Sequence, residues 1–392
     1  MWKHVVSNAL TLFIVGLAAL GGYVAWAQSQ YTAAGPLETA ICVQVPPGSN
    51  MRALANDLRA EGAISNAAIF RIGAEYSDKS SLLKAGSFLV GEGASMEDIV
   101  DIVTRGGAST CGTEIVFRVG VNAQRVEVRE LDPATSRFET VASFDPAEEA
   151  APPAYEDVAA EADTRFRIAV AEGVTSWQVV EALKAAEFLE GSVEDVPPEG
   201  TLAPDSYEVQ DRTPKADVLA RMAEAQDARL AGAWANRADG LPLESPEEAL
   251  VLASIIEKET AVPEERRTVA SVFINRLNRG MRLQTDPTVI YGITQGRGVL
   301  GRGIRQSELQ AETPWNTYVI DGLPPTPIAN PGLASIEAAL DPEATNLIFF
   351  VADGTGGHAF AETLDEHNAN VAKWREIERE RDAEREASDN DG

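Results

Sequence analysis

The feature that most constrains this chain is an uncharged apolar run near its N-terminus. From Ala9 to Ala27 the sequence reads ALTLFIVGLAALGGYVAWA, which is 19 residues. A helix of that length spans about 28 Å, close to the thickness of the hydrocarbon core of a bilayer. Lys3 precedes the run, and Tyr23 and Trp26 fall where an interfacial aromatic belt would lie. The sequence therefore predicts one transmembrane helix over residues 9–27, with residues 1–8 in the cytoplasm and the rest of the chain outside.

A cleaved signal peptide is the alternative explanation of this run. Ala25-Trp26-Ala27 resembles an A-x-A cleavage site. The apolar region is longer than the 7–15 residues usual in signal peptides, which favours an anchor. Residues 28–36 are mostly small or polar, and we expect them to form a tether between the membrane and the first folded part.

Charge and composition exclude several functions. Asp and Glu number 61 against 33 Lys and Arg, a net charge of -28. Such a chain is a poor partner for nucleic acid, whose phosphates require cationic side chains. The sequence contains no CxxC pair, HExxH motif or P-loop, so we expect neither a metal nor another cofactor. Outside the cytoplasm the two cysteines, Cys42 and Cys111, can be oxidised to each other, or they can remain as two thiols in the core.

An internal repeat follows the predicted tether. VQVPPGSNMRALANDLRAEGAI, from Val43, aligns without gaps with IAVAEGVTSWQVVEALKAAEFL, from Ile168, and Gly48 then meets Gly173. In each copy alternating apolar residues indicate a strand, and helical spacing follows the glycine. The later stretches LKAGSFLV and LAPDSYEV resemble a second strand, and each leads into another helix. We predict a small module of the order strand, helix, helix, strand, present twice, over residues 38–110 and 166–236.

The segment between the two copies, residues 111–165, has a different character. Its first part alternates apolar and polar residues like two or three strands. Its second part, DPAEEAAPPAYEDVAAEAD, is acidic and rich in Ala and Pro, which is typical of a mobile linker.

Longer elements begin near residue 237 and continue to about residue 375. Ser245 is a predicted N-cap, with Pro246 at the first helical position and Glu248 as capping-box partner. A second helix is predicted near Pro263; it would end before Gly280 and carry on one face Val269, Val272, Phe273 and Leu277. Residues 376–392 are charged in nearly every turn, which predicts a solvated helix that frays into a tail.

Glu257 ends an apolar stretch, Ala249 to Ile256, that only Ser254 interrupts. Such a stretch is typical of a buried helix. Burial and the negative end of the helix dipole both disfavour a carboxylate anion, so this position predicts a group that holds and donates a proton. Lys258 and Glu259 are expected to point elsewhere. The alternative is a structural ion pair between Glu257 and an arginine, and four are available: Arg266, Arg267, Arg276 and Arg282.

Other polar residues are candidates for binding a substrate. Gln284, Thr285 and Asp286 could bind hydroxyl or acetamido groups, although Asp286 before Pro287 is also typical of a turn. Asn316 and Tyr318 suit a sugar ring, but Tyr318 could equally be a core residue. Three arginines in GRGVLGRGIRQ either belong to a flexible surface loop or bind carboxylates; they are Arg297, Arg302 and Arg305. His358 and His367 do not make a convincing metal site.

Three long motifs carry a resemblance to a known family. They are LASIIEKETAVPEERRTVASVFINRLNRGMRLQTDPTVIYG, NTYVIDGLPPTPIANPG and FFVADGTGGHAFAETLDEHNANV. In sequence and order they resemble the YceG-like family, and the membrane helix and first module, which resembles the family's LysM-like subdomain, fit as well. The resemblance implies an α+β protein with one transmembrane helix, LysM-like βααβ modules and a mixed α/β catalytic domain over residues 237–375. Residues 111–165 look like an insertion.

The resemblance also implies an activity. The family cleaves the β-1,4 bond between N-acetylmuramic acid and N-acetylglucosamine within peptidoglycan strands, leaves 1,6-anhydro ends, and works beside peptidoglycan synthases at the inner membrane, with the bulk of the chain in the periplasm. Its catalytic glutamate falls on Glu257. Two alternatives stay open: a hydrolytic muramidase using a second acid (Glu259, Glu264 or Asp286), and a non-catalytic scaffold that binds the cell wall through its repeated modules.

Overall fold

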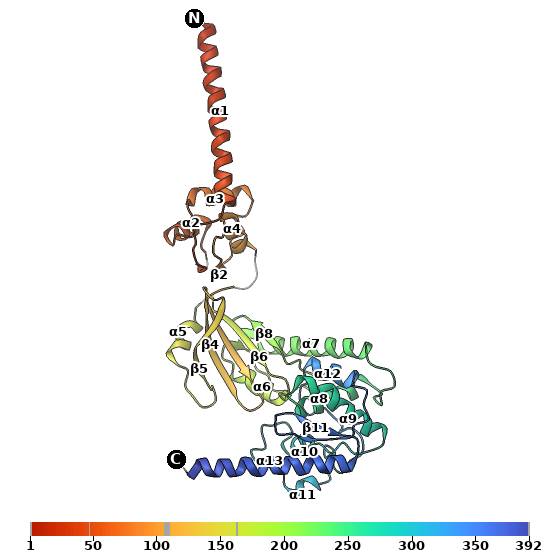
Figure 1. The fold of residues 1–392 in the computed structure, drawn as a ribbon. Coiled ribbons are helices and arrows are strands. Elements are labelled where there is room, and N and C mark those ends of the chain that lie inside the picture. The colour runs from red at the N-terminus through yellow and green to blue at the C-terminus, as the bar shows by residue number, and fades with distance from the viewer. Residues whose placement is uncertain (1, 47, 106–109, 162–163, 391–392) are drawn as a thin grey trace. The chain divides into compact units, whose positions relative to one another are not determined.

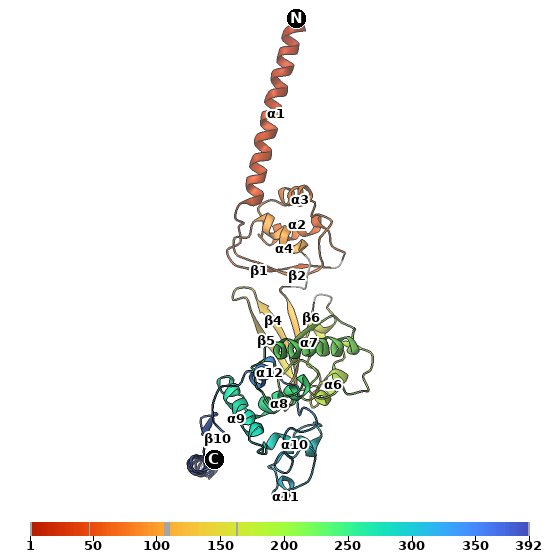
Figure 2. The ribbon, with the colours of Figure 1, turned by 90° about the vertical axis from the view of Figure 1, so that its right-hand side faces the viewer.

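A computed structural model describes residues 2–46, 48–105, 110–161 and 164–390. The chain is a mixed α+β protein that divides into two compact units (Figures 1 and 2). Unit 1 comprises Met1–Val116, Val126–Phe144 and Ala150–Phe166, and unit 2 comprises Phe117–Arg125, Asp145–Glu149 and Arg167–Gly392.

Helix α1, Trp2–Thr32, contains the apolar run. Its part from Leu10 to Thr32 is long and apolar enough to cross a membrane. The helix ends five residues beyond the predicted boundary at Ala27, because Ala27 and Tyr31 pack against the core of the first module. The tether predicted over residues 28–36 is therefore wrong: the chain after α1 is bound to the module, where Gly35 N donates to Gly93 O at 3.0 Å.

The first module has the predicted order of elements. Strand β1 (Ile41–Val45) pairs antiparallel with β2 (Gly86–Val90), and α2 (Met51–Ala60) and α3 (Ala67–Tyr76) lie between them in sequence. Helix α4 (Met96–Thr104) follows β2, and its N-cap Ser95 forms a capping box with Asp98. The core is made of buried apolar side chains from the two strands and the three helices, among them Leu54, Leu58, Phe70 and Ile99.

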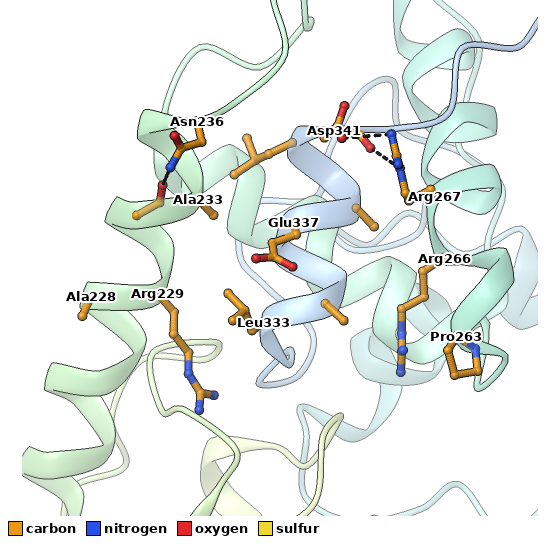
Figure 3. A pocket seen from close by; sticks show the side chains of 14 residues that line it. Ala228, Arg229, Ala233, Asn236, Pro263, Arg266, Arg267, Leu333, Glu337 and Asp341 are labelled. Carbon is orange, nitrogen blue, oxygen red and sulfur yellow. Dashed lines mark hydrogen bonds and ion pairs between the residues drawn. The ribbon is translucent and has the colours of Figure 1, made fainter.

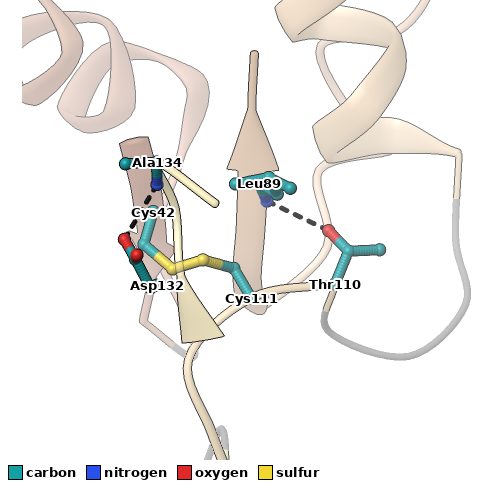
Figure 4. Close-up of a disulfide and its surroundings, with 6 residues drawn as sticks. All are labelled: Cys42, Leu89, Thr110, Cys111, Asp132 and Ala134. Atoms are coloured by element: carbon teal, nitrogen blue, oxygen red, sulfur yellow. Dashed lines mark hydrogen bonds between the residues drawn. A yellow bond between two sulfur atoms is a disulfide. The ribbon is translucent and has the colours of Figure 1, made fainter. Parts of the chain in front are cut away.

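A disulfide joins Cys42 of β1 to Cys111 (Figure 4). Their Cα atoms are 5.7 Å apart, and the bond closes a sequence separation of 69 residues. Beside it, the Thr110 hydroxyl accepts a hydrogen bond from Leu89 N at 3.0 Å. Of the two alternatives that the sequence left open for these cysteines, the structure has the disulfide.

The segment after Cys111 forms three strands, as its alternation predicted: β3 (Thr113–Val119), β4 (Gln124–Asp132) and β5 (Arg137–Phe144). With β6 (Arg165–Val170) and β8 (Ser206–Val209) they make a five-stranded sheet of order β5-β4-β3-β6-β8. The acidic stretch predicted as a linker contains a short helix, α5 (Pro153–Ala159). Tyr155 of this helix packs edge-on against Phe144, with ring centroids 5.4 Å apart.

The second copy of the repeat matches the first only in its opening half. Gly48 and Gly173 both have φ 79°, and the next helices, α2 and α6 (Ser176–Ala185), are capped by Asn50 and Thr175 at equivalent positions. Between α6 and β8, where every residue is described, the predicted second helix is missing. Residues 191–205 instead contain Gly191 and Gly200, both at positive φ, and three prolines, which do not suit a helix. Short strands β7 (Leu189–Glu190) and β9 (Thr213–Pro214) pair there, and α7 (Lys215–Ala235) follows.

The remaining elements of unit 2 surround helix α8 (Pro246–Glu259). They are η1 (Pro263–Glu265), α9 (Arg266–Asn278), α10 (Asp286–Thr294), α11 (Gln306–Leu309), α12 (Leu333–Leu340), the antiparallel hairpin β10–β11 (Phe349–Ala352 and His358–Ala361) and α13 (Leu364–Asn390). The helix near Pro263 thus forms as predicted and buries Val269, Val272 and Phe273. Residues 376–390 belong to α13, and the last two residues of the predicted tail lie outside the described ones.

The N-terminus of α8 differs from its prediction in one contact. Ser245 caps the helix by accepting from Glu248 N at 3.3 Å, and Pro246 takes the first helical position. The side chain of Glu248 does not complete a capping box with Ser245. It accepts from Glu244 N at 2.7 Å, one residue earlier, where it still satisfies a free amide at the positive end of the helix.

Candidate active site

Helix α8 carries Glu257 in its last turn, and the core of unit 2 fixes this helix on all sides. Ala249 through Ile256 are buried, as predicted. The buried hydroxyl of Ser254 donates to Val251 O and accepts from Ile328 N at 3.0 Å, so the one polar residue of the stretch ties α8 to the loop before α12. The helix ends at Thr260, whose backbone is extended. A carboxylate on this helix is therefore held by a rigid support.

Two neighbours hold the carboxylate oxygens of Glu257 in a defined position. Its Oε2 accepts a hydrogen bond from Gly332 N at 3.0 Å, at the start of α12. Its Oε1 lies 4.0 Å from Nη2 of Arg266, and the Glu257 side chain is only 6% exposed. Its stem passes close to Gly173, where an added Cβ would lie 3.6 Å from Glu257 Cγ.

Of the four arginines considered as partners of Glu257, Arg266 is the one beside its carboxylate. Their distance of 4.0 Å is the outer limit for an ion pair. The other three arginines have different partners. Arg267 pairs with Asp341 at 2.9 Å, Arg276 donates to the carbonyls of Leu283 and Ile348, and Arg282 pairs with Asp321 at 3.1 Å. Glu257 is therefore oriented mainly by a backbone amide, and the guanidinium adds a positive charge nearby.

Glu172, which the sequence did not indicate as a site residue, is a second carboxylate beside this pair. Its Oε2 lies 3.5 Å from the same Nη2 of Arg266, so Arg266 stands between two acids. Burial, and after it the charge of Glu257, raises the pKa of Glu172, while Arg266 acts in the opposite direction. A Cβ on Gly332 would lie 1.7 Å from Glu172 Oε1, so Glu172 packs directly against the residue that binds Glu257.

A sequence signal for Glu172 existed in the repeat. The alignment that pairs Gly48 with Gly173 pairs Glu172 with Pro47. The two copies therefore differ just before the turn glycine, where the second copy has an acid and the first has a proline. Only the second copy lies in the unit that contains Glu257. The signal is visible once the site is known, but composition and spacing alone do not single it out.

Glu259 points away from Glu257, as predicted, but Lys258 does not. Its Cδ and the Cγ of Glu257 both lie against Gly173, 3.4 and 3.6 Å from the place of an added Cβ. Lys258 Nζ donates to Gly173 O at 3.2 Å, and burial lowers the pKa of this ammonium against the opposing charges of Glu257 and Glu199. Glu259 accepts from the Thr285 hydroxyl at 2.7 Å, and burial raises the pKa of its carboxyl. Glu257 and Lys258 therefore share the surroundings of Gly173, whereas Glu259 contacts Thr285.

The residues Gln284, Thr285 and Asp286 lead into α10, and they differ in accessibility. Gln284 is exposed and has φ 47°, an uncommon backbone for a residue other than glycine. Thr285 is only 2% exposed, and both its amide and its hydroxyl are used inside the protein. Asp286 is exposed and accepts a hydrogen bond from the Tyr318 hydroxyl at 2.6 Å.

Asn316 and Tyr318 also differ in accessibility. Asn316 has no exposed surface; its Nδ2 donates to the carbonyls of Glu308, Leu309 and Ala311, and its Oδ1 accepts from Tyr318 N. The side chain of Asn316 stabilises its own loop and is not accessible to a ligand. Tyr318 is half-buried, and burial, before its bond to Asp286, raises the pKa of its phenol. The structure thus brings Asp286 and Tyr318 together, and Gln284 lies two residues before Asp286 in the chain.

The three arginines of the GRGVLGRGIRQ segment lie on an exposed stretch. Arg302 pairs with Glu308 at 2.6 Å, and this pair lowers the pKa of the Glu308 carboxyl to about 2. Farther along the chain, His358 Nδ1 lies 2.7 Å from Glu265 Oε2, and the ring of His367 stacks on Phe349. Each histidine therefore has a structural neighbour of its own.

A pocket of about 820 Å³ borders the carboxylate pair through Arg266 (Figure 3). Helices α7, α9 and α12 form its walls. Arg229 enters from α7 and Arg266 from α9, on opposite sides of Glu337. Arg266 is the guanidinium that this pocket shares with Glu172 and Glu257, whereas Arg229 pairs with Asp205 and donates to Pro204 O at 3.0 Å.

Comparisons with known proteins complete the description of this site. The model of the YceG-like family matches residues 43–373. An endolytic murein transglycosylase of Bacillus subtilis is 28% identical over 346 residues, covering 86% of this chain and 85% of that protein. One of Streptococcus pneumoniae is 28% identical over 385 residues, covering 95% of this chain and 66% of that protein. A crystal structure of a yceG-like protein from Listeria monocytogenes shares 25% identity, covers 84% of this chain and 98% of its own, and has a TM-score of 0.46. The chain belongs to the YceG-like family.

Proposed function

We propose that this protein is a membrane-anchored endolytic lytic transglycosylase of peptidoglycan. It cleaves the β-1,4 bond between N-acetylmuramic acid and N-acetylglucosamine inside nascent glycan strands, leaves 1,6-anhydro-muramic ends, and so ends strand elongation. Two relatives that are named endolytic murein transglycosylases, each matched over more than four fifths of this chain, support the reaction. The observation that carries the proposal is Glu257, a nearly buried carboxyl on a rigid helix end with a backbone amide on one oxygen.

The reaction needs one acid because the substrate supplies its own nucleophile. Glu257 gives its proton to the glycosidic oxygen as the bond to the anomeric carbon breaks. The C6 hydroxyl of the muramic acid then attacks that carbon, and its proton passes to Glu257, which restores the starting state. Ordinary glycosidases use two carboxylates, one of them as base or nucleophile. Gly332 N–H keeps one oxygen fixed, so the carboxyl keeps its orientation between the two proton transfers.

Substrate contacts are proposed for the exposed members of the predicted set. Gln284, Asp286 and Tyr318 bind hydroxyl or acetamido groups of the glycan, since each offers a polar group on or near the surface. Thr285 and Asn316 act from inside: Thr285 binds Glu259, and Asn316 holds the loop that precedes Tyr318.

A hydrolytic muramidase is the second candidate, and Glu172 is the observation that favours it. A hydrolase needs another carboxylate near the acid. Glu259 accepts the Thr285 hydroxyl, and Asp286 accepts the Tyr318 hydroxyl. Glu172 shares Arg266 with Glu257 and its side chain is 44% exposed, so it is the acid best placed to activate water.

The proposed setting is the inner membrane. Helix α1 crosses it once, residues 1–8 stay in the cytoplasm, and the bulk of the chain lies in the periplasm, near peptidoglycan synthases. Residues 38–110 form a LysM-like module, residues 166–236 a connecting one, and residues 237–375 the catalytic domain. The apolar span from Leu10 to Thr32 supports the anchor.

The test is a digest of purified peptidoglycan by the full-length protein in detergent, analysed by mass spectrometry beside Glu257→Gln. Internal anhydro-muramic ends from the wild type alone are the expected result. Reducing ends that carry oxygen from labelled water would instead indicate the muramidase, and Glu172→Gln would then abolish them. Equal activity of wild type and Glu257→Gln would remove Glu257 from the mechanism, and no activity in either would favour a wall-binding scaffold.

A further inference from the structure

Helix α3 of the first module exposes an apolar stripe beside the membrane helix. Ala68, Ile72 and Tyr76 follow one another at intervals of four residues, and all three are exposed, Ile72 by 60% and Tyr76 by 91%. Residues four apart lie on one face of a helix. We call these three side chains the α3 stripe.

Helix α2 of the same module shows what an exposed face in water looks like on this chain. It is also ten residues long, and its exposed positions are polar or charged apart from Ala60. They are Arg52, Asn56, Asp57 and Arg59. The exposed positions of α3 are thus apolar apart from Glu75, whereas those of α2 are polar or charged apart from Ala60, and Ile72 and Tyr76 lie next to α1.

Ile72 and Tyr76 of the α3 stripe lie beside the end of the apolar run of α1. One pocket is lined by Tyr23, Val24 and Ala27 of α1 together with Ile72 and Tyr76 of α3. Val24 stands three residues, or about 4.5 Å along the helix, before Ala27, where the apolar run ends. The same pocket extends to Gln28, Tyr31 and Thr32 of α1 and to Glu97 of α4. Ile72 and Tyr76 therefore lie beside the end of the apolar run and the polar residues after it, which is the level of the interfacial layer.

The contact between α1 and α3 is tight, so this depth is fixed. Tyr31 packs on Gly73, where an added Cβ would lie 2.2 Å from the tyrosine ring. Helix α1 is continuous to Thr32, and Gly35 then bonds to Gly93 of the module. No flexible segment separates the membrane helix from the module within residues 2–46, so the module cannot move away from the membrane surface without losing these contacts.

We propose that the α3 stripe is a membrane-docking surface, seated in the interfacial layer of the bilayer that α1 crosses. The proposal rests on the membrane anchor in the proposed function. Tyrosine favours this layer because its ring is apolar and its hydroxyl reaches water, and Ile72 buries its exposed surface there. The first module then stays seated on the membrane surface. The glycan that the protein can reach is therefore the glycan nearest the lipid.

Spin labels on single cysteines test this directly in the full-length protein. The two native cysteines form a disulfide, so a new cysteine is the only thiol available to the label. The positions are Ile72→Cys and Tyr76→Cys on the stripe, Leu17→Cys within the span, and Val141→Cys on β5, an apolar residue that is 50% exposed and serves as the matched control. All four side chains are at least half exposed, so the labels leave the core intact.

The protein is reconstituted into vesicles of phosphatidylethanolamine and phosphatidylglycerol, and each label is exposed to oxygen, which enters lipid, or to a water-soluble nickel chelate. We expect labels at residues 72 and 76 to lose nickel accessibility and gain oxygen accessibility relative to Val141, with Leu17 the most lipid-exposed. A lipid-exposed Leu17 with residues 72 and 76 equal to Val141 would overturn the docking surface and leave the anchor intact. A water-exposed Leu17 would overturn both.

Discussion

The carboxylate of Glu257 accepts a hydrogen bond from the backbone amide of Gly332 at 3.0 Å. These residues are 75 positions apart in sequence and meet because α12 packs against α8. The amide belongs to a glycine whose missing side chain leaves room for Glu172. One residue therefore orients the proposed acid and admits a second carboxylate.

Substituting Gly332 by alanine is expected to act through Glu172. The backbone tolerates the change, since Gly332 has φ -72°, but the new methyl would occupy the place of Glu172 Oε1. Gly332→Ala and Glu172→Ala should each lower the rate of glycan cleavage, and the double variant should be no slower than the slower single one. A double-mutant cycle on cleavage rates measures this coupling, expected at about 0.5–3 kcal/mol. Strictly additive effects would contradict it, and Gly303→Ala, whose methyl meets nothing within 4 Å, is the control.

Asn316 is expected to matter for stability and not for contact with the substrate. Asn316→Asp replaces an amide that donates to three carbonyls by a group that repels them. Leaving buried acceptors unpaired costs about 1–3 kcal/mol each, so unfolding in denaturant should shift clearly to lower concentration. Tyr318→Phe, which removes one hydroxyl near the surface, should shift it far less. Unchanged stability in Asn316→Asp would show that the loop does not depend on this amide.

Glu199 should make stability depend on pH. Burial raises the pKa of its carboxyl, against hydrogen bonds from Ser176 and Tyr291. The folded state thus keeps a proton that the unfolded state loses above about 4.3. The stability from this group is complete below that pH and is lost as the pH rises through the folded pKa. Glu199→Gln should therefore melt higher than wild type at pH 8, and the difference should shrink at pH 4. A difference in melting temperature that grows as the pH falls would contradict a raised pKa for Glu199.

The disulfide should stabilise unit 1 without taking part in catalysis. Cross-linking residues 69 apart stabilises by about 4 kcal/mol in the loop-entropy model. Dithiothreitol should lower the unfolding temperature of the first module, and the double variant Cys42→Ser/Cys111→Ser should melt at the lowered temperature with or without it. Glycan cleavage should stay near the wild-type rate in both cases, and a large loss of activity would indicate that the disulfide also supports the site.

Local patterns in the sequence were sufficient for many of the elements. The proposed acid was identified through the resemblance to the YceG-like family, because the local pattern at Glu257 also allowed a structural ion pair. The apolar run placed α1, alternation placed β3, β4 and β5, and the apolar stretch ended by Glu257 placed α8 and its carboxylate. These features follow from the periodicity of side chains along one segment, which a sequence displays directly. The second helix of the second repeat was wrong because prolines and glycines within residues 191–205 outweighed the alignment.

The sequence by itself determined which segments are helices and strands, which helix is buried, and that Glu257 is the acid to test. Only the tertiary structure decided what surrounds it. Glu172 lies in the turn after β6, Arg266 begins α9 and Gly332 immediately precedes α12. Their meeting depends on how these segments pack against the end of α8. The same reason removed Asn316 from the surface and brought Ile72 and Tyr76 beside the end of the apolar run of α1. Periodicity encodes the faces of each element, whereas distances between residues far apart in sequence are set by packing.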